Sequence, residues 1–390
     1  MKVYCVSIFL CYNSRVMQKE DLKELEEKNK EKLEEEMVQP TQKKSKRWIT
    51  AAFLGFSLAV VAVIAILEFG GDKDRSLESH AFNFGFLALA VGCFAAALLC
   101  ETVKYSYLLY RRRAKCRYSR IYMGFSTGVI GKYYDNITPS GIGGQGFQMY
   151  HLAHYGSDAG TAAGLPIIGY LGLQFSFVII ALFSMIFGNK YLGDLVVIRA
   201  TAIAGLVCYA FMPFCIVFFA IAPKFLERII RWGTKMGGKL HILKHPDTAA
   251  EKVVEYLRMY TDTLREFARS ASQVFVVAAV SVIYQLAFMS LPYFVLHFFG
   301  ANIGFVECFC RVVYIYCAMT LIITPGNSGG AEAGFYMVFS SLSGGAVFWG
   351  MLVWRVLCYY SWIILGAIIQ LKLRLRENKE IKEANDKAGS

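Results

Sequence analysis

Two short segments of this chain combine helix-breaking residues with flanks that are apolar enough to lie in a membrane. Residues 138–147 read TPSGIGGQGF, and residues 324–333 read TPGNSGGAEA. Hydrocarbon offers no water to loose backbone N–H and C=O groups, so irregular backbone at that depth must be buried in protein or line a cavity. Each segment therefore predicts a broken helix and a functional site near the middle of the membrane.

The two segments also match each other. When the two segments are aligned at one fixed offset in the sequence, Thr-Pro aligns with Thr-Pro and Gly-Gly aligns with Gly-Gly. Both segments also have apolar flanks. Two such matches at the same offset predict an internal duplication. The paired positions are Thr138 with Thr324, Pro139 with Pro325, Gly143 with Gly329, and Gly144 with Gly330.

The composition supports a membrane location. Hydrophobic residues make up 56% of the 390 residues and charged residues only 18%, which lies outside the usual range of soluble domains. Apolar runs of about 20 residues recur, and each is long enough for a membrane helix. The net charge of +12 lies mostly in short loops beside these runs. This pattern indicates topology signals and headgroup contact rather than nucleic-acid binding, and we predict an all-α polytopic membrane protein.

Six apolar segments are the predicted full spans, and polar segments make up the rest. We expect a charged cytosolic tail at 1–47, a membrane domain at 48–371 with a cytosolic loop at 221–270, and a cytosolic tail at 372–390. A surface helix is predicted inside the loop, at 248–268. The full spans are 49–68, 84–108, 161–188, 196–220, 271–299 and 346–371.

Positive charge sets the predicted topology. The basic segments 111–120 and 221–270 are placed in the cytoplasm, because cytoplasmic loops carry an excess of Lys and Arg. The two spans between them cross the membrane outward and then back again. Residues 121–156 are therefore predicted to form a re-entrant hairpin that starts and finishes on the cytoplasmic side. Counting the membrane crossings of the second half in the same way predicts that 305–343 is a hairpin that enters from the opposite face of the membrane. Because 305–323 is long enough to cross by itself, a full crossing is the alternative.

Each half of the membrane domain then contains two spans, one broken-helix hairpin and one closing span. The first half is 49–188 and the second is 196–371, and they run in opposite directions. This arrangement predicts an inverted-topology repeat with six full spans and two re-entrant broken-helix hairpins, as in several secondary transporters.

The breaks and the final span resemble the motifs of a known family. The segments are ITPSGIGGQGFQMYHL (137–152), ITPGNSGGAEAGFYMVF (323–339) and WRVLCYYSWIILGAI (354–368). The first two resemble the signature motifs of the lysylphosphatidylglycerol synthase transmembrane-region family, the flippase-like domain. The third resembles the family's Arg–Tyr–Gly closing motif through Arg355, Tyr359, Tyr360 and Gly366. The resemblance covers roughly 48–371, and Gly146 departs from it, because the nearest subgroup would place Pro there.

The resemblance implies a multi-pass protein of the bacterial plasma membrane, and the topology places both termini in the cytoplasm. The best-known members join a flippase to a cytosolic acyltransferase domain, which moves lysine from charged tRNA onto phosphatidylglycerol and so blunts cationic antimicrobial peptides. Only about 19 residues follow the last predicted span. We therefore expect no lysyltransferase chemistry from this chain by itself.

Candidate substrate-binding residues gather at the two breaks. A helix that restarts at each Gly pair would present free N–H groups and a positive dipole end, which suit a lipid phosphate. The alternative is that the glycines only allow close helix packing. The candidates are Thr138, Pro139, Gly141, Gly143, Gly144 and Gln145 at the first break, and Thr324, Pro325, Gly326, Gly329, Gly330 and Glu332 at the second, together with Arg311 and Arg355.

The charged candidates each have two interpretations. Glu332 could compensate the helix dipole or meet a cationic headgroup such as a lysyl amine. Glu307 and Arg311 are four residues apart in an apolar segment, so they could form a structural ion pair or contact substrate. The same alternatives hold for Arg355.

Other polar residues in apolar segments are assigned simpler roles. Glu101 and Lys104 are expected to snorkel toward the inner end of their span. His151, His154 and Asp158 share one helix face, but no fourth metal ligand accompanies them. We therefore predict neither a metal site nor a cofactor.

The leading functional hypothesis is lipid translocation. The cargo would be an anionic or aminoacylated phospholipid, such as lysyl-phosphatidylglycerol, or a polyprenyl-phosphate lipid. One alternative is a phosphatidylglycerol lysyltransferase or other lipid-headgroup transferase, with a role in lipid metabolism and antibiotic resistance. Another is a scaffold subunit for a separate synthase. The expected partners are a phospholipid headgroup, with a soluble synthase and a second copy of the chain as candidates.

Overall fold

The computed structural model describes residues 82–138, 141, 143–193, 196–239, 246–324, 326–342 and 344–388. All of them belong to the second of two compact units, Val63–Ser390. The predicted cytosolic tail at 1–47, the predicted span at 49–68, and the break residues Pro139 and Pro325 lie outside the described residues.

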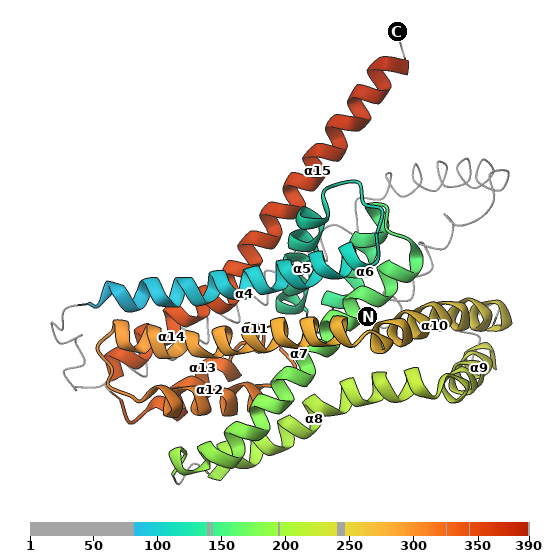
Figure 1. Ribbon diagram of the computed structural model, residues 1–390. Coiled ribbons are helices and arrows are strands. Elements are labelled where there is room, and N and C mark those ends of the chain that lie inside the picture. The colour runs from blue at the N-terminus through green and yellow to red at the C-terminus, as the bar shows by residue number, and fades with distance from the viewer. Residues whose placement is uncertain are drawn as a thin grey trace. The chain divides into compact units, whose positions relative to one another are not determined.

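Among the described residues, five helices are long and apolar enough to cross a membrane. They coincide with five of the six predicted spans, and the all-α polytopic membrane class is thereby confirmed (Figure 1). A helix of 28 residues rises about 42 Å, which exceeds a hydrocarbon core of about 30 Å. The helices are α4 (Phe84–Arg111), α7 (Ala159–Gly188), α8 (Val196–Ile221), α11 (Ala271–Phe298), and the run formed by α14 (Gly344–Arg355), a π-helical turn (Val356–Tyr360) and α15 (Ser361–Ala388).

Side-chain caps mark where two of these helices begin. The Asn83 side chain accepts a hydrogen bond from the Gly85 N–H at the start of α4. The Asp158 carboxylate accepts one from the Thr161 N–H, at 2.9 Å, at the start of α7. Such caps satisfy N–H groups that a helix cannot pair internally.

Four shorter helices flank the two breaks. The first break lies between α5 (Arg120–Ile137) and α6 (Gly144–His154), and the second lies between α12 (Phe305–Met319) and α13 (Gly330–Phe339). The 15 residues of α12 rise only about 22 Å. This is shorter than the hydrocarbon core. The re-entrant hairpin at 305–343 and its alternative, a full crossing by 305–323, both stay predictions.

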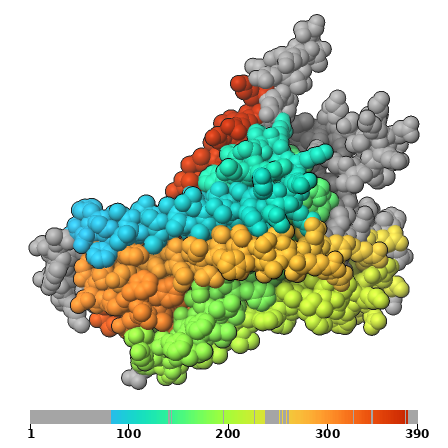
Figure 2. Space-filling view, viewed as in Figure 1, coloured from blue at the N-terminus to red at the C-terminus, as the bar shows by residue number. Residues whose placement is uncertain are grey.

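The helices of the two halves exchange contacts reciprocally. In each half the two hairpin arms pack together, α5 on α6 and α12 on α13. The closing span of each half packs on the other half's first hairpin arm, α15 on α5 and α7 on α12. The spans that precede the hairpins, α4 and α11, lie side by side (Figures 1 and 2). An inverted-topology repeat predicts this exchange, and the symmetry itself remains a prediction.

The predicted cytosolic loop folds as two helices. They are α9 (Pro223–Lys239) and α10 (Pro246–Arg269), and α10 corresponds to the predicted surface helix at 248–268. α10 packs on α9 and on α7. The Arg112 guanidinium at the end of α4 forms an ion pair with Glu266 of α10, at 2.5 Å.

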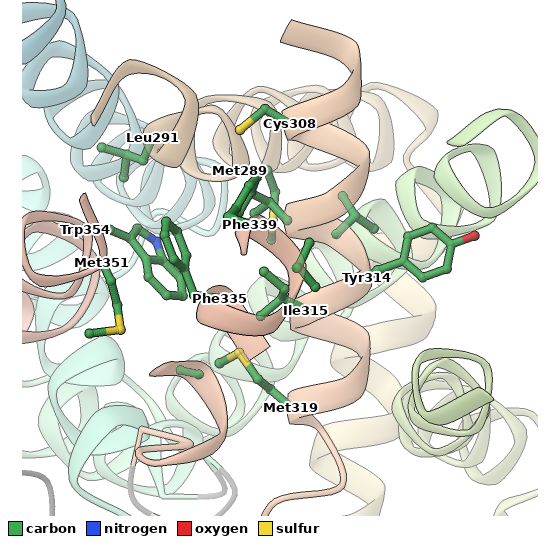
Figure 3. Close-up of a cluster of buried hydrophobic side chains, with 14 of the residues drawn as sticks. Met289, Leu291, Cys308, Tyr314, Ile315, Met319, Phe335, Phe339, Met351 and Trp354 are labelled. Carbon is green, nitrogen blue, oxygen red and sulfur yellow. The ribbon is translucent and has the colours of Figure 1, made fainter. Parts of the chain in front are cut away.

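One apolar cluster holds the second hairpin in place. Phe335 of α13 stacks on Trp354 of α14, with ring centroids 4.9 Å apart, and both side chains are buried. Figure 3 shows Met289 of α11, Ile315 of α12 and Met319 of α12 around them. The second break is therefore anchored to packed side chains from three neighbouring helices.

Close packing of α8 on α12 generates a first prediction. A Cβ atom added to Gly205 of α8 would overlap the Cys317 carbonyl of α12, and backbone cannot move aside as a flexible side chain can. Gly205→Ala should lower stability by about 2 kcal/mol or more. The measurement is thermal unfolding in detergent. Gly92→Ala is the matched control, because nothing lies within 4 Å of the added atom. Equal unfolding temperatures for the two variants would contradict the close approach.

Candidate functional site

The first break is closed by side chains of α5. Thr138 Oγ1 donates to the Tyr134 carbonyl (2.6 Å) and accepts from the Gly143 N–H (3.0 Å). The Gly144 N–H, where α6 starts, donates to Asp135 Oδ1 at 3.0 Å. A Cβ at Gly144 would overlap that carboxylate. The structure thus brings together three predicted residues, and it adds Asp135, which the sequence analysis missed.

The second break is closed in a related way. Thr324 Oγ1 donates to the Ser328 carbonyl at 2.8 Å, and the Gly329 N–H donates to Glu332 Oε2 at 2.7 Å. Gly329 has a φ of +88° and Gly326 a φ of +58°, a region that favours glycine. A Cβ at Gly326 would also overlap the Tyr359 ring. For Gly326, close packing is therefore a sufficient explanation.

Glu332 and Arg355 form a buried ion pair across the second break. Glu332 Oε1 lies 2.7 Å from Arg355 Nε, and the two side chains are 1% and 5% exposed. Arg355 also donates to the Gly326 carbonyl (3.3 and 3.4 Å) and to Ser328 Oγ (3.0 Å). Its guanidinium lies 4.6 Å from the centroid of the Tyr359 ring. Arg355 thus ties the final span to the turn that precedes α13.

These contacts bear on the predicted phosphate site. The N–H groups of Gly144 and Gly329 were expected to be free for a lipid phosphate, but each already donates to a protein carboxylate. Glu332 occupies the first turn of α13, where an acid compensates the helix dipole. A phosphate that used these N–H groups would have to replace Asp135 or Glu332.

Arg311 lies at the opposite end of α13 from this pair. Its Nη2 is 2.6 Å from Glu307 Oε1, and its Nη1 donates to the Val338 carbonyl at 2.7 Å. The guanidinium therefore joins α12 to the last turn of α13. The structure favours the ion-pair interpretation of Arg311 and does not bring it to the break.

The remaining glycines and Gln145 complete the predicted set. Gly141 has a φ of +63°, so it supports the turn between α5 and α6. A Cβ at Gly330 would overlap the Ile322 side chain, which indicates close packing there. Gln145 is half-buried, whereas Gln148 on the next turn is buried, accepts from the Tyr105 hydroxyl (3.2 Å) and donates to the Thr127 carbonyl (3.0 Å).

A charged cluster beside the first break was not predicted. Glu101 and Lys104 of α4 form an ion pair at 2.8 Å and are 2% and 1% exposed, so the expectation that they snorkel is wrong. Lys132 of α5 lies 4.9 Å from the centroid of the Tyr284 ring of α11 and interacts electrostatically with Glu101 and Asp135. Ionisable residues at membrane depth are functional candidates by default. The sequence does contain a pattern that could have predicted this cluster. An acid and a lysine lie three residues apart in each of two apolar segments.

The His151, His154 and Asp158 pattern does not form one site. His151 Nε2 lies 2.8 Å from Ser126 Oγ, the His154 ring stacks on Tyr150, and Asp158 caps α7. Within the part of the chain that the structure describes, no group of three or more His, Cys, Asp or Glu residues could hold a metal ion.

A cavity of about 310 Å³ lies between α5, α6 and α15. Tyr134 and Phe147 are on its wall, and the Tyr134 hydroxyl donates to Gln370 Oε1 at 3.3 Å. Arg374 supplies a cationic side chain. Because the Tyr134 carbonyl also holds Thr138, the cavity adjoins the first break.

Long apolar helices, polar breaks and buried ion pairs define a polytopic helical membrane protein. A family model described as the lysylphosphatidylglycerol synthase TM region matches residues 48–366, and the chain belongs to this family. The chain is also similar to a UPF0104 membrane protein of Archaeoglobus fulgidus, with 26% identity over 252 residues that cover 60% of this chain and 70% of the relative. No solved structure matches the chain.

The buried ion pair at the second break generates a stability prediction. Glu332→Gln and Arg355→Gln should each lower stability by about 3–5 kcal/mol, because each leaves a buried charge without its partner. The double variant should lose less than the sum of the two losses. The measurement is thermal unfolding of the three variants in detergent.

Glu307→Gln is the matched control, because Glu307 is 31% exposed in its ion pair with Arg311. A loss of about 1 kcal/mol or less is expected there. Additive losses at Glu332 and Arg355 would show that the two side chains are not coupled.

Proposed function

We propose that the protein moves a phospholipid between the leaflets of the membrane. The cargo class is an anionic or aminoacylated phospholipid, such as lysyl-phosphatidylglycerol, or a polyprenyl-phosphate lipid. The observation that carries the proposal is the presence of two broken-helix hairpins whose turns are held by charged side chains. The family match supports this class of protein, and the family description itself names lysylphosphatidylglycerol.

The charges of the site suit a headgroup. A charged group at the centre of a bilayer costs about 3 kcal/mol, so a path for headgroups must offer compensating charge. Arg355 and Lys132 supply cations next to the two breaks, and Glu332 and Asp135 supply carboxylates. In the proposed mechanism, a lipid phosphate replaces a carboxylate at a cation, and a lysyl amine engages the displaced carboxylate.

The reciprocal packing of the two halves supports alternating access. Each closing span rests on the other half's first hairpin arm, through the contacts of α15 with α5 and of α7 with α12. Rocking of one half against the other would repack both contacts at once. It would expose the breaks to one leaflet and then to the other.

We place the protein in a bacterial plasma membrane, with both termini in the cytoplasm. The basic segments 111–120 and 221–270 support this orientation. The ion pair between Arg112 and Glu266 joins these two segments, as a shared side of the membrane requires.

A translocation assay tests the proposal. Fluorescent phosphatidylglycerol and lysyl-phosphatidylglycerol are placed in liposomes that hold the purified protein, and a membrane-impermeant reductant reports movement between leaflets. Wild type should move both lipids. Gly329→Leu should stop movement, because its φ of +88° disfavours a side chain. Glu332→Gln should slow the lysylated lipid more, because only that lipid offers an amine to the carboxylate.

Gly92→Leu on the open face of α4 is the control for added bulk, and thermal unfolding verifies that each variant is folded. No movement of either lipid by folded wild type would contradict the proposed function for these substrates.

A second prediction concerns the cluster beside the first break. Lys132→Gln should slow phosphatidylglycerol movement about tenfold or more, because one charge-assisted contact is worth about 1.5–3 kcal/mol. Lys372→Gln removes the same charge from an exposed position on α15 and should leave the rate unchanged. Equal slowing by both variants would attribute the effect to overall charge rather than to the site.

A further inference from the structure

Helix α9 carries an exposed apolar stripe outside the membrane spans. Phe225, Ile229, Trp232 and Met236 are 47%, 41%, 65% and 40% exposed. Their spacing of four, three and four residues places them within an arc of about 60° on the helix. Four large apolar side chains on one face are a patch that requires a covering surface.

The other faces of α9 have different partners. Glu227, Ile230 and Thr234 are partly buried on the side of the helix opposite the stripe, and α10 packs against α9. Glu227 forms an ion pair with Arg231 (2.9 Å) and lies 3.8 Å from Arg258 of α10. The contact with α10 therefore leaves the apolar stripe exposed.

Basic side chains line one edge of the stripe. An α-helix turns by about 100° per residue. This rotation places the basic side chains along the flank of α9 between the apolar stripe and the face that packs against α10. They are exposed, so they are accessible to an anionic surface. The residues are Lys224, Arg228, Arg231 and Lys235.

The stripe continues the lipid-facing surface of a membrane span. Only Ala222 separates α9 from α8. The last turn of α8 exposes Phe218 (53%) and Ile221 (74%), and the Phe218 ring lies 6.0 Å from that of Phe225. An apolar surface that begins in the hydrocarbon thus extends without interruption onto α9.

We propose that α9 lies in the headgroup layer of the adjacent leaflet and binds anionic phospholipid there. An apolar face flanked by Lys and Arg is the pattern of helices that lie in the interface plane. In this arrangement the stripe enters the acyl boundary, and the basic edge meets phosphates. Charge and continuity with α8 favour a lipid surface over a protein partner. The proposal holds whether or not the protein moves lipids.

Lipid quenching of Trp232 fluorescence tests the position of α9. The full chain is placed in bilayers that contain acyl-brominated lipids, and the difference between wild type and Trp232→Phe isolates the signal of this residue. Brominated lipid should quench that signal strongly, and aqueous iodide should quench it weakly. Quenching by iodide alone would overturn the proposal and leave the stripe to a protein partner.

Charge variants test the preference for anionic lipid. In mixed bilayers, brominated phosphatidylglycerol should quench Trp232 several-fold more than its share of the lipid predicts, because each basic residue attracts anionic headgroups. Arg228→Gln combined with Lys235→Gln should remove most of this preference. The matched control is Arg265→Gln combined with Arg269→Gln, the same loss of charge from exposed positions on α10. An equal loss of preference in the control, or no loss in either variant, would contradict recognition by the edge of α9.

Discussion

Backbone groups that are freed inside a membrane must find partners within the protein, and this constraint shapes both breaks. Water cannot satisfy them in hydrocarbon, where each unpaired group costs several kcal/mol. In this chain a carboxylate accepts from one backbone N–H near the start of the helix that follows each break, Asp135 from Gly144 and Glu332 from Gly329. Threonine hydroxyls hold further groups of the turns. The turns are therefore closed structures, and any ligand that binds them must compete with these internal contacts.

The two halves reach this result from different sequence positions. Asp135 lies on the arm before the first break, nine residues ahead of its N–H partner, whereas Glu332 lies on the arm after the second break, three residues beyond its partner. The slot that matches Glu332 in the first half is Gly146, which is exposed. The first half thus has a glycine in that slot and an acid, Asp135, at another place. Each restarting helix therefore has a carboxylate at its N-terminus, and the two halves supply it from different positions.

Local patterns predicted more of this protein than contacts between distant segments did. Five spans and both breaks follow from apolar runs and from the positions of Gly and Pro. A spacing of four residues offered the ion pair of Glu307 with Arg311 as one of two interpretations. The partners of Arg355 lie 23, 27 and 29 residues away, and the Tyr284 partner of Lys132 lies on another span. No sequence period encodes such pairs. The error at Glu101 and Lys104 has the same origin, because α11 and α5 cover α4 and leave these side chains no path to the membrane surface.

Charge balance limits how a headgroup could use the site. The buried pair of Glu332 and Arg355 is neutral overall, and so is the cluster of Glu101, Lys104, Lys132 and Asp135. An anionic headgroup added to the ion pair or to the cluster would leave one uncompensated negative charge. This charge would lie in an environment of low dielectric constant, where charges interact strongly. Exchange of a protein carboxylate for a lipid phosphate keeps the contacts of the cation, but it releases a carboxylate that needs a new partner. A lysyl amine on the same lipid would supply that partner, so a zwitterionic or cationic aminoacyl lipid suits this arrangement better than a simple anion.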